Sequence, residues 1–205
     1  MDSFLLKNKI NHFWEWFVKH EKQFREISDP AATRELLDNQ VLQFGVFSWE
    51  IGKGKDKPHT FTISPNGDEK MLSRSEAIIG EAPELPHWSF FPAKPAREWD
   101  FTFEMFDSFM LQQTIDAAEW EFIFRMTLDR KLKVFIYAEN IDFLDADDKL
   151  SAADFVLNQI IGEMDKIYYV DSVSFIEVLD ENQEEDLKLM TAFKFEFEKL
   201  LDELL

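Results

Sequence analysis

The chain contains no cysteine among its 205 residues. This absence excludes disulfide bonds, thiolate zinc sites and a cysteine nucleophile. Small secreted scaffolds usually depend on disulfides, so the sequence favours a cytoplasmic location. No stretch approaches the roughly 18 consecutive apolar residues that a membrane-spanning helix needs. Residues 1–17 also lack the basic and apolar regions of a signal peptide, so we expect a soluble protein.

Basic residues are scarce as well. The sequence has 22 Lys and Arg against 41 Asp and Glu, which gives a formal net charge of −19 at pH 7. Nucleic-acid binding depends on clustered Lys and Arg that contact phosphates, so we expect no nucleic-acid partner. Repulsion from anionic lipids argues against a membrane partner too. A negative charge of this size is complementary to a basic protein partner. The alternative is that the acidic side chains are simply exposed to water and bind no partner.

Motifs for catalysis and for metal binding are missing. The four histidines lie in no metal-ligand or triad motif: His12 and Glu15 have the spacing of two ligands on one helix face, but no second such pair completes a site. Gly52 and Gly54 lack the rest of a phosphate-binding loop. The acidic stretch 142–148 lacks the Gly and Glu that a calcium-binding EF-hand requires at fixed positions. The sequence thus predicts no catalytic residue, no cofactor and no metal site. It favours a protein that is not an enzyme, without deciding the question.

Aromatic residues, in contrast, are abundant: 22 Phe and 6 Trp stand beside 3 Tyr. They dominate the clearest pattern in the chain, residues 119–141. Apolar and polar residues alternate along 120–128, the chain turns at 129–130, and the alternation resumes along 132–138. A period of two is typical of a strand with one buried face. We predict a β-hairpin at the centre of a sheet, with the even-numbered residues of both strands in the core.

The remaining segments show helical and strand patterns in turn. Apolar residues at helical spacing predict an amphipathic helix over 3–27. Asp29 and Pro30 predict the start of a second helix that ends near Gln43. Three more helices are expected over 71–82, over 152–163 with Ser151 as N-cap, and over 187–204, where 193–197 also alternates as a strand would. Strands are expected over 44–51, 59–64, 87–91, 98–107 and 168–179. The pattern of 108–118 is ambiguous, and a short strand over 109–113 followed by a turn is one alternative.

These elements predict an α+β fold. We expect a mostly antiparallel sheet of about six or seven strands, with an N-terminal helix pair and C-terminal helices packed on it. A chain of this length is expected to bury one sizeable core and to form a single globular domain over residues 1–205.

Three stretches carry a resemblance. They are 13–17 (FWEWF), 81–88 (EAPELPHW) and 157–165 (LNQIIGEMD), the last followed by the end of an expected strand. The chain resembles a family of uncharacterised bacterial proteins that open with an F-W-x-W-F helix, contain an A-P-x-x-x-x-W stretch and end with an L-G-E-x-D-like helix and strand. Ile161 replaces the leucine of that last motif. The resemblance spans most of the chain, supports a single domain and implies no known activity or site.

Candidate binding residues are aromatic or acidic. Trp16 flanks the apolar stripe of the first helix, where it is either the edge of the core or an exposed anchor. The acids of 142–148 have two interpretations. They either stabilise the N-terminus of the next helix through its dipole or form, with the acidic stretch 180–186, a surface for a basic partner. Two carboxylates after Gly162 are either a catalytic pair or polar groups at a helix end. The candidates are Trp16, Trp88, Asp145, Asp147, Asp148, Glu163 and Asp165.

The sequence favours a non-enzymatic protein-interaction module that engages a basic protein. One alternative is a small-ligand-binding protein whose aromatic pocket is lined by Trp88, Trp99 and Trp120, although core packing explains these tryptophans equally well. A second alternative is a hydrolase whose carboxylates converge from distant segments of the chain.

Overall fold

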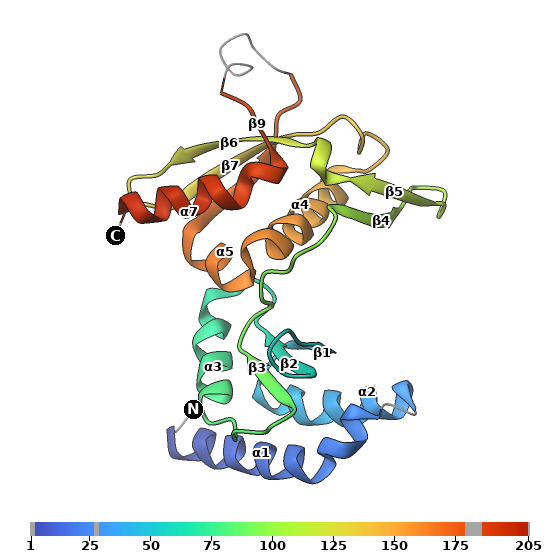
Figure 1. Ribbon diagram of the computed structural model, residues 1–205, viewed down its shortest axis with the longest axis vertical. Helices are drawn as coiled ribbons and strands as arrows, with labels where there is room; N and C mark the ends of the chain where they lie inside the picture. Colours follow the sequence, from blue (N-terminus) through green and yellow to red (C-terminus); the bar gives the residue numbers. More distant parts are fainter. Residues whose placement is uncertain (1–2, 27–28, 179–185, 205) are drawn as a thin grey trace. The chain divides into compact units, whose positions relative to one another are not determined.

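A computed structural model of the chain describes residues 3–26, 29–178 and 186–204 (Figure 1). The chain forms two compact units, Met1–Lys94 and Pro95–Leu205, and each unit has its own cluster of buried side chains. The α+β class is confirmed. A single domain over residues 1–205 stays a prediction, because two cores are compatible with one or with two unfolding transitions. In the described ranges, no helix is long and apolar enough to cross a membrane.

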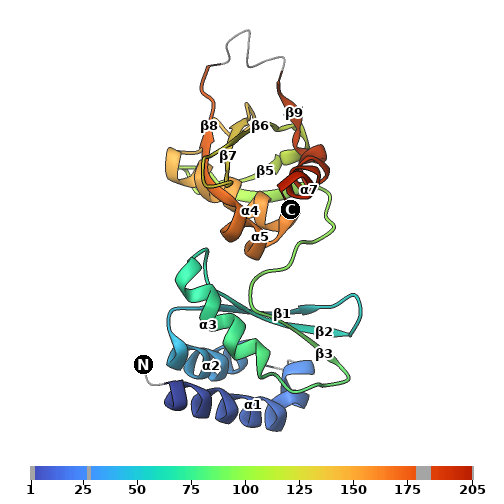
Figure 2. The same ribbon diagram turned by 90° about the vertical axis from the view of Figure 1, so that its left-hand side faces the viewer.

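The first unit combines helices with a three-stranded sheet. Its elements are α1 (Ser3–Arg25), α2 (Pro30–Val41), the 3-10 helix η1 (Leu42–Phe44), β1 (Ser48–Lys53), β2 (His59–Ser64), α3 (Glu69–Gly80) and β3 (Trp88–Phe91). The strand order is β1-β2-β3, with β1 antiparallel and β3 parallel to β2. Helices α1 and α2 lie on the same side of this sheet (Figures 1 and 2).

Aromatic side chains from α1 hold the core of the first unit together. The ring of Phe17 lies 5.1 Å from that of Phe61 and 5.2 Å from that of Trp88, between centroids. The indole of Trp14 donates a hydrogen bond of 2.7 Å to the carbonyl oxygen of Ile78 on α3. The amphipathic helix expected from the apolar spacing is therefore confirmed as far as Arg25, and residues 27–28 lie outside the described ranges.

The second helix starts as the sequence predicted. Asp29 is its N-cap, and its carboxylate accepts hydrogen bonds of 3.0 Å from the backbone N–H groups of Ala31 and Ala32. Pro30 occupies the first turn, where a missing N–H costs nothing because that group would have no partner within the helix.

The second unit contains two sheets and the C-terminal helices. Its elements are β4 (Thr102–Phe106), β5 (Gln112–Asp116), the 3-10 helix η2 (Ala117–Glu119), β6 (Glu121–Met126), β7 (Leu132–Tyr137), α4 (Ala146–Ile161), α5 (Glu163–Tyr169), β8 (Val170–Phe175), β9 (Lys188–Leu189), the 3-10 helix η3 (Met190–Ala192) and α7 (Phe193–Leu204). Strands β4 and β5 form one antiparallel sheet, and the other sheet has the order β8-β7-β6-β9. Helices α4, α5 and α7 lie on one side of this larger sheet (Figures 1 and 2).

The predicted central hairpin is confirmed as β6 and β7, the two inner strands of the four-stranded sheet. Trp120 and Phe122 are fully buried, as expected, but the buried face ends earlier than predicted. Met126 and Leu128 are exposed rather than in the core. Met126 is the last paired residue of β6, opposite Leu132, and Leu128 belongs to the loop 127–131, which leaves the sheet.

The prediction of one mostly antiparallel sheet with six or seven strands is wrong. The described strands form three sheets of three, two and four strands. In addition, β3 pairs parallel with β2, and β8 pairs parallel with β7. Each of these pairs is joined through helices, and such a crossover returns the chain in the same direction, which a hairpin does not. Alternation along a single strand contains no information about which strand lies beside it.

The helix expected over 152–163 begins earlier, at Ala146. Its N-cap is Asp145, whose carboxylate accepts a hydrogen bond of 2.9 Å from the backbone N–H of Asp148. Ser151, the expected cap, lies inside the helix and donates its hydroxyl to the carbonyl oxygen of Asp147 at 2.9 Å. The acids of 145–148 therefore form the first turn of α4, where the helix dipole favours negative charge.

This assignment leads to a stability prediction. Asp145→Ala should lower the free energy of unfolding by about 1 kcal/mol, the typical loss for an N-cap side chain. Ser151→Ala, the matched control, should change it by no more than about 0.5 kcal/mol, because the hydroxyl only bonds within the helix. Urea unfolding followed by tryptophan fluorescence measures both. Equal losses in the two variants would contradict a helix start at Ala146.

Candidate functional site

The two candidate tryptophans are part of the first unit's packing. Trp88 is fully buried, and its ring lies 5.2 Å from that of Phe17. Trp16 is half-buried, with its ring 4.8 Å from that of His20 and 5.5 Å from that of Phe24. Trp16 therefore forms the edge of the core, which is one of the two interpretations that the sequence left open.

The acidic candidates lie in the second unit and do not converge. Asp145, Asp147 and Asp148 are exposed in and before the first turn of α4. Glu163 is buried at the first position of α5, and Asp165 is half-buried two residues later. Of the acidic stretch 180–186, residues 180–185 lie outside the described ranges.

Gly162 explains how Glu163 and Asp165 come to lie at a helix start. Its φ of +82° ends α4, and the chain begins α5 at the next residue. Burial raises the pKa of the Asp165 carboxyl, and the negative charge of Glu198 raises it further. Both acids occupy the first turn of α5, which is a favourable place for negative charge.

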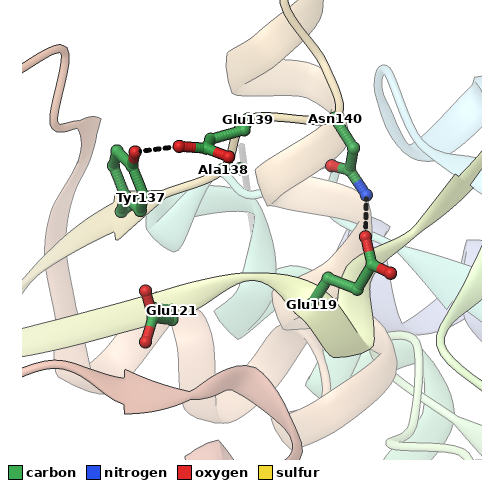
Figure 3. Close-up of a pocket in the computed structure, with 6 residues that line it drawn as sticks. All are labelled: Glu119, Glu121, Tyr137, Ala138, Glu139 and Asn140. Atoms are coloured by element: carbon green, nitrogen blue, oxygen red, sulfur yellow. Dashed lines mark hydrogen bonds between the residues drawn. The ribbon is translucent and has the colours of Figure 1, made fainter.

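The structure brings a different set of carboxylates together. A cavity of about 360 Å³ is lined by Glu119, Glu121, Tyr137, Ala138, Glu139 and Asn140 (Figure 3). These residues lie at the end of the central hairpin away from its turn: Glu121 and Tyr137 are in the strands, and the others directly precede β6 or follow β7. Glu121 pairs directly with Tyr137 across the strands, and Glu119 and Glu139 lie two residues beyond this pair. The hairpin register thus places Glu121 and Glu139 near the phenol of Tyr137, whereas Glu119 lies beside Asn140 (Figure 3).

Hydrogen bonds to the core fix one wall of this cavity. The buried indole of Trp120 donates to the side-chain oxygen of Asn140 at 2.8 Å. The amide nitrogen of Asn140 donates to the carbonyl oxygen of Asp116 at 2.8 Å and to the Glu119 carboxylate at 3.4 Å. On the other wall, the Tyr137 hydroxyl donates to the Glu139 carboxylate (Figure 3).

A second cavity, of about 720 Å³, shares Tyr137, Ala138 and Glu139 with the first. Apolar side chains from β8 and α4 line part of it, among them Val173 and Leu150. Charged groups complete its lining: Glu139, Asp142, Lys149 and Glu177. We call the two cavities together the acidic groove, because its lining has five carboxylates, from Glu119, Glu121, Glu139, Asp142 and Glu177, and one ammonium group, from Lys149.

Carboxylates of the acidic groove act on the phenol of Tyr137. The hydrogen bond to Glu139 raises the pKa of Tyr137, and burial and the charges of Glu139, Glu121 and Asp142 raise it further. The ammonium nitrogen of Lys149 forms an ion pair with a carboxylate oxygen of Asp142 at 3.1 Å. Carboxylates that raise the pKa of a phenol produce a negative potential, which attracts cations.

The net charge of the chain is concentrated in the unit that contains this groove. Residues 95–205 carry 27 Asp and Glu against 10 Lys and Arg, a net charge of −17, and residues 1–94 carry 14 against 12, a net charge of −2. The two values add up to the −19 of the whole chain. The negative charge is therefore a property of the second unit.

A third cavity lies in the first unit, along α1. It has a volume of about 500 Å³ and is lined by Asn11, Trp14, Glu15, Val18, Lys19, Glu81 and Pro83. Its charged groups are of both signs, so it has no clear preference for one kind of ligand. Among the described residues, no group of three or more His, Asp and Glu is arranged to hold a metal ion.

Comparisons of the chain with protein-family models, with curated proteins and with solved structures gave no match. The resemblance to a bacterial family therefore stays a prediction, and the chemistry of the acidic groove is the main guide to function. Sequence patterns did not single out Glu119, Glu121, Glu139 or Glu177 as site residues. The signal that could have found the first three is the hairpin register.

The phenol of Tyr137 offers a test of the groove's potential. Its pKa should lie above that of tyrosine in a peptide, and Glu139→Gln should lower it, because this change removes a negative charge beside the phenol. Absorbance titration of tyrosinate measures the pKa, and Tyr137→Phe identifies the residue. Asp129→Asn, at the opposite end of the hairpin, is the control and should leave it unchanged. If Glu139→Gln and Asp129→Asn changed the pKa of Tyr137 equally, the negative potential would not be local to the groove.

The burial of Asp165 leads to a prediction about the variant Asp165→Asn: it should be more stable than the unchanged chain, by an amount that depends on pH. The pKa of Asp165 is raised in the folded protein, so the ionised carboxyl opposes folding at pH values above that pKa. Asp165→Asn should therefore raise the free energy of unfolding at neutral pH. The gain should shrink as the pH falls through the raised pKa and vanish below the unfolded pKa. Asp171→Asn, on the exposed part of β8, is the control for urea unfolding at several pH values.

Proposed function

We propose that this chain is a non-enzymatic interaction module that binds a basic protein through the acidic groove of residues 95–205. The observation that carries the proposal is the placement of Glu119, Glu121 and Glu139 around one cavity, in a unit with a net charge of −17 that follows from 27 acidic and 10 basic residues. The proposal also places the protein in the cytoplasm of a bacterium, which the lack of cysteine and the family resemblance support.

The groove suits the side chains of lysine and arginine. These side chains have an apolar stem and a cationic end. The apolar lining from Val173 and Leu150 can pack on the stem. The carboxylates of Glu119, Glu121 and Glu139 can accept hydrogen bonds from an ammonium or guanidinium group, and such charge-assisted bonds are the stronger kind.

The expected binding depends on salt. Ion pairs at an exposed site are worth about 0.2–1 kcal/mol each, so a stable complex needs several of them. A net charge of this size also accelerates the encounter with a positively charged protein, and added salt screens that effect. We therefore expect affinity to fall steeply as the salt concentration rises.

The two alternatives from the sequence receive less support. A ligand pocket lined by tryptophans does not fit, because Trp88 and Trp120 are fully buried and the indole of Trp120 is bonded to Asn140. A hydrolase that works through two converging carboxyl groups needs one of them as a general acid with a raised pKa. Burial raises the pKa of Asp165, but this residue lies on α5 and lines neither cavity of the acidic groove.

A lysine-rich synthetic peptide tests the proposal. The full chain should bind it at low salt and release it at high salt, as measured by isothermal titration calorimetry. The triple variant Glu119→Gln, Glu121→Gln, Glu139→Gln should bind about tenfold more weakly, since three lost ion pairs together are worth about 1.4 kcal/mol.

The matched control removes the same charge from the first unit. Glu15, Glu26 and Glu35 are exposed there, and their replacement by Gln should weaken binding by no more than about twofold. Equal losses in the two triple variants would show that only the overall charge acts, which would refute the groove. Binding that does not depend on salt would refute the electrostatic proposal as a whole.

A further inference from the structure

The turn between β4 and β5 exposes a run of large apolar side chains. Phe106, Phe109, Met110 and Leu111 have 55%, 82%, 75% and 59% of their surface exposed. We call residues 106–111 the apolar tip. Single exposed apolar residues are ordinary, but a contiguous group of them on a soluble protein marks a contact surface.

The apolar tip has a fixed backbone. The carboxylate of Asp107 accepts hydrogen bonds of 2.9 Å from the backbone N–H groups of Phe109 and Leu111, and another of 2.9 Å from the side-chain amide of Gln113. The backbone N–H of Asp107 donates to the carbonyl oxygen of Leu111 at 2.9 Å. A loop held in this way loses little conformational entropy when a partner binds it.

The base of the hairpin is anchored to the core of its unit. The ring of Phe103 on β4 lies 5.2 Å from that of Phe155 on α4 and 6.1 Å from that of Trp120. Figure 1 shows β4 and β5 extending away from the helices of this unit toward the turn. The hairpin is therefore held at one end and presents its apolar side chains at the other.

The acidic residues around the apolar tip indicate which kind of partner is complementary to it. From Glu98 to Phe124 the sequence has seven acidic residues and neither Lys nor Arg. Three of the acids belong to the hairpin itself, with Glu104 and Asp107 nearer its turn and Asp116 at its base. A second copy of this chain or an anionic bilayer would bring more negative charge against them, and such contacts between like charges are unfavourable. A surface with lysine or arginine beside an apolar groove is complementary to both the tip and its acidic border.

We propose that the apolar tip docks into an apolar groove bordered by Lys and Arg side chains on a protein partner. This inference rests on the proposed function for the charge of the partner, and it adds a second contact site on which affinity depends. Buried aromatic anchors contribute more to binding than exposed ion pairs do. Phe109 and Met110 at the end of the turn are then the anchors, and the acidic residues guide the encounter.

The probe is a synthetic amphipathic helix with a leucine stripe flanked by lysines, compared with an all-lysine peptide. Phe109→Ser with Met110→Ser should weaken binding of the leucine–lysine helix at least about tenfold and should leave binding of the all-lysine peptide unchanged. Leu128→Ser with Phe195→Ser, which removes two exposed apolar side chains elsewhere in the unit, is the matched control and should change neither. Fluorescence anisotropy of labelled peptides measures both affinities.

The result that would overturn the inference is an unchanged affinity of the tip variant for the leucine–lysine helix. Failure of the acidic groove is recognised separately, because the triple Glu→Gln variant would then bind both peptides as the unchanged chain does. Asp107→Ala, which leaves the apolar side chains in place but frees the turn, should weaken binding of the leucine–lysine helix by a smaller factor.

Two further measurements test whether the apolar tip instead contacts a second copy of the chain or an anionic bilayer. Sedimentation equilibrium of the unchanged chain should give the mass of a monomer, and a dimer that the tip variant abolishes would assign the tip to a second copy. Vesicles of phosphatidylglycerol should not retain the chain on centrifugation. Retention that the tip variant abolishes would assign the tip to a membrane, and either of these assignments would overturn the proposal.

Discussion

The hydrogen bond between the indole of Trp120 and the side chain of Asn140 joins the core of residues 95–205 to the acidic groove. Trp120 is fully buried, with its ring 6.1 Å from the rings of both Phe103 and Phe175. A buried indole N–H without a partner costs about 1–3 kcal/mol, so this bond holds Asn140 in place. Asn140 in turn donates to the carboxylate of Glu119. The packing of the core thereby determines where one wall of the groove lies, and the base of the hairpin β4–β5 depends on the same tryptophan.

The concentration of negative charge in one unit is unfavourable for folding. Repulsion among the acids of residues 95–205 opposes a compact state, and ion pairs such as Asp142 with Lys149 and Glu196 with Lys188 relieve part of it. The burial of Trp120, Phe122, Phe193 and other apolar side chains has to offset this repulsion. The first unit reaches a comparable core with a nearly balanced charge. The excess of acids is thus a cost to the second unit that the first unit does not bear, and the proposed contact with a basic partner would account for it.

Local patterns predicted many of the elements, although not α5 or β9, and they missed the long-range pairing. The spacing of apolar residues on α1 and the N-cap Asp29 are signals within a few residues, and both gave the observed helices. The pairing of β3 with β2 and of β8 with β7 depends on how α3, α4 and α5 pack, which no single strand records. The start of α4 shows a related difficulty. Asp145 and Ser151 are both acceptable N-caps, and Asp145 is used because residues 146–151 also fit a helix.

The acidic groove was predictable only in part. The alternation of residues 119–141 contains enough information to predict the half of the groove that the hairpin forms. A turn centred between Asp129 and Arg130 would place Phe122 opposite Tyr137, whereas the structure places Phe122 opposite Ile136. Opposite residues share a face of the sheet. Since Phe122 and Ile136 both belong to sets that alternation predicts to be buried, that pattern alone favours the observed register. The same register sets Glu121 against Tyr137.

Followed two residues further along each strand, that register leads to Glu119 and Glu139. The three carboxylates of the smaller cavity could thus have been inferred from the sequence. The other half of the groove could not. Asp142 lies before α4, and Glu177 follows β8, which reaches β7 only through the parallel pairing that α4 and α5 make possible. The apolar lining for a lysine or arginine stem comes from these same elements. Its place beside the carboxylates is therefore a consequence of tertiary packing alone.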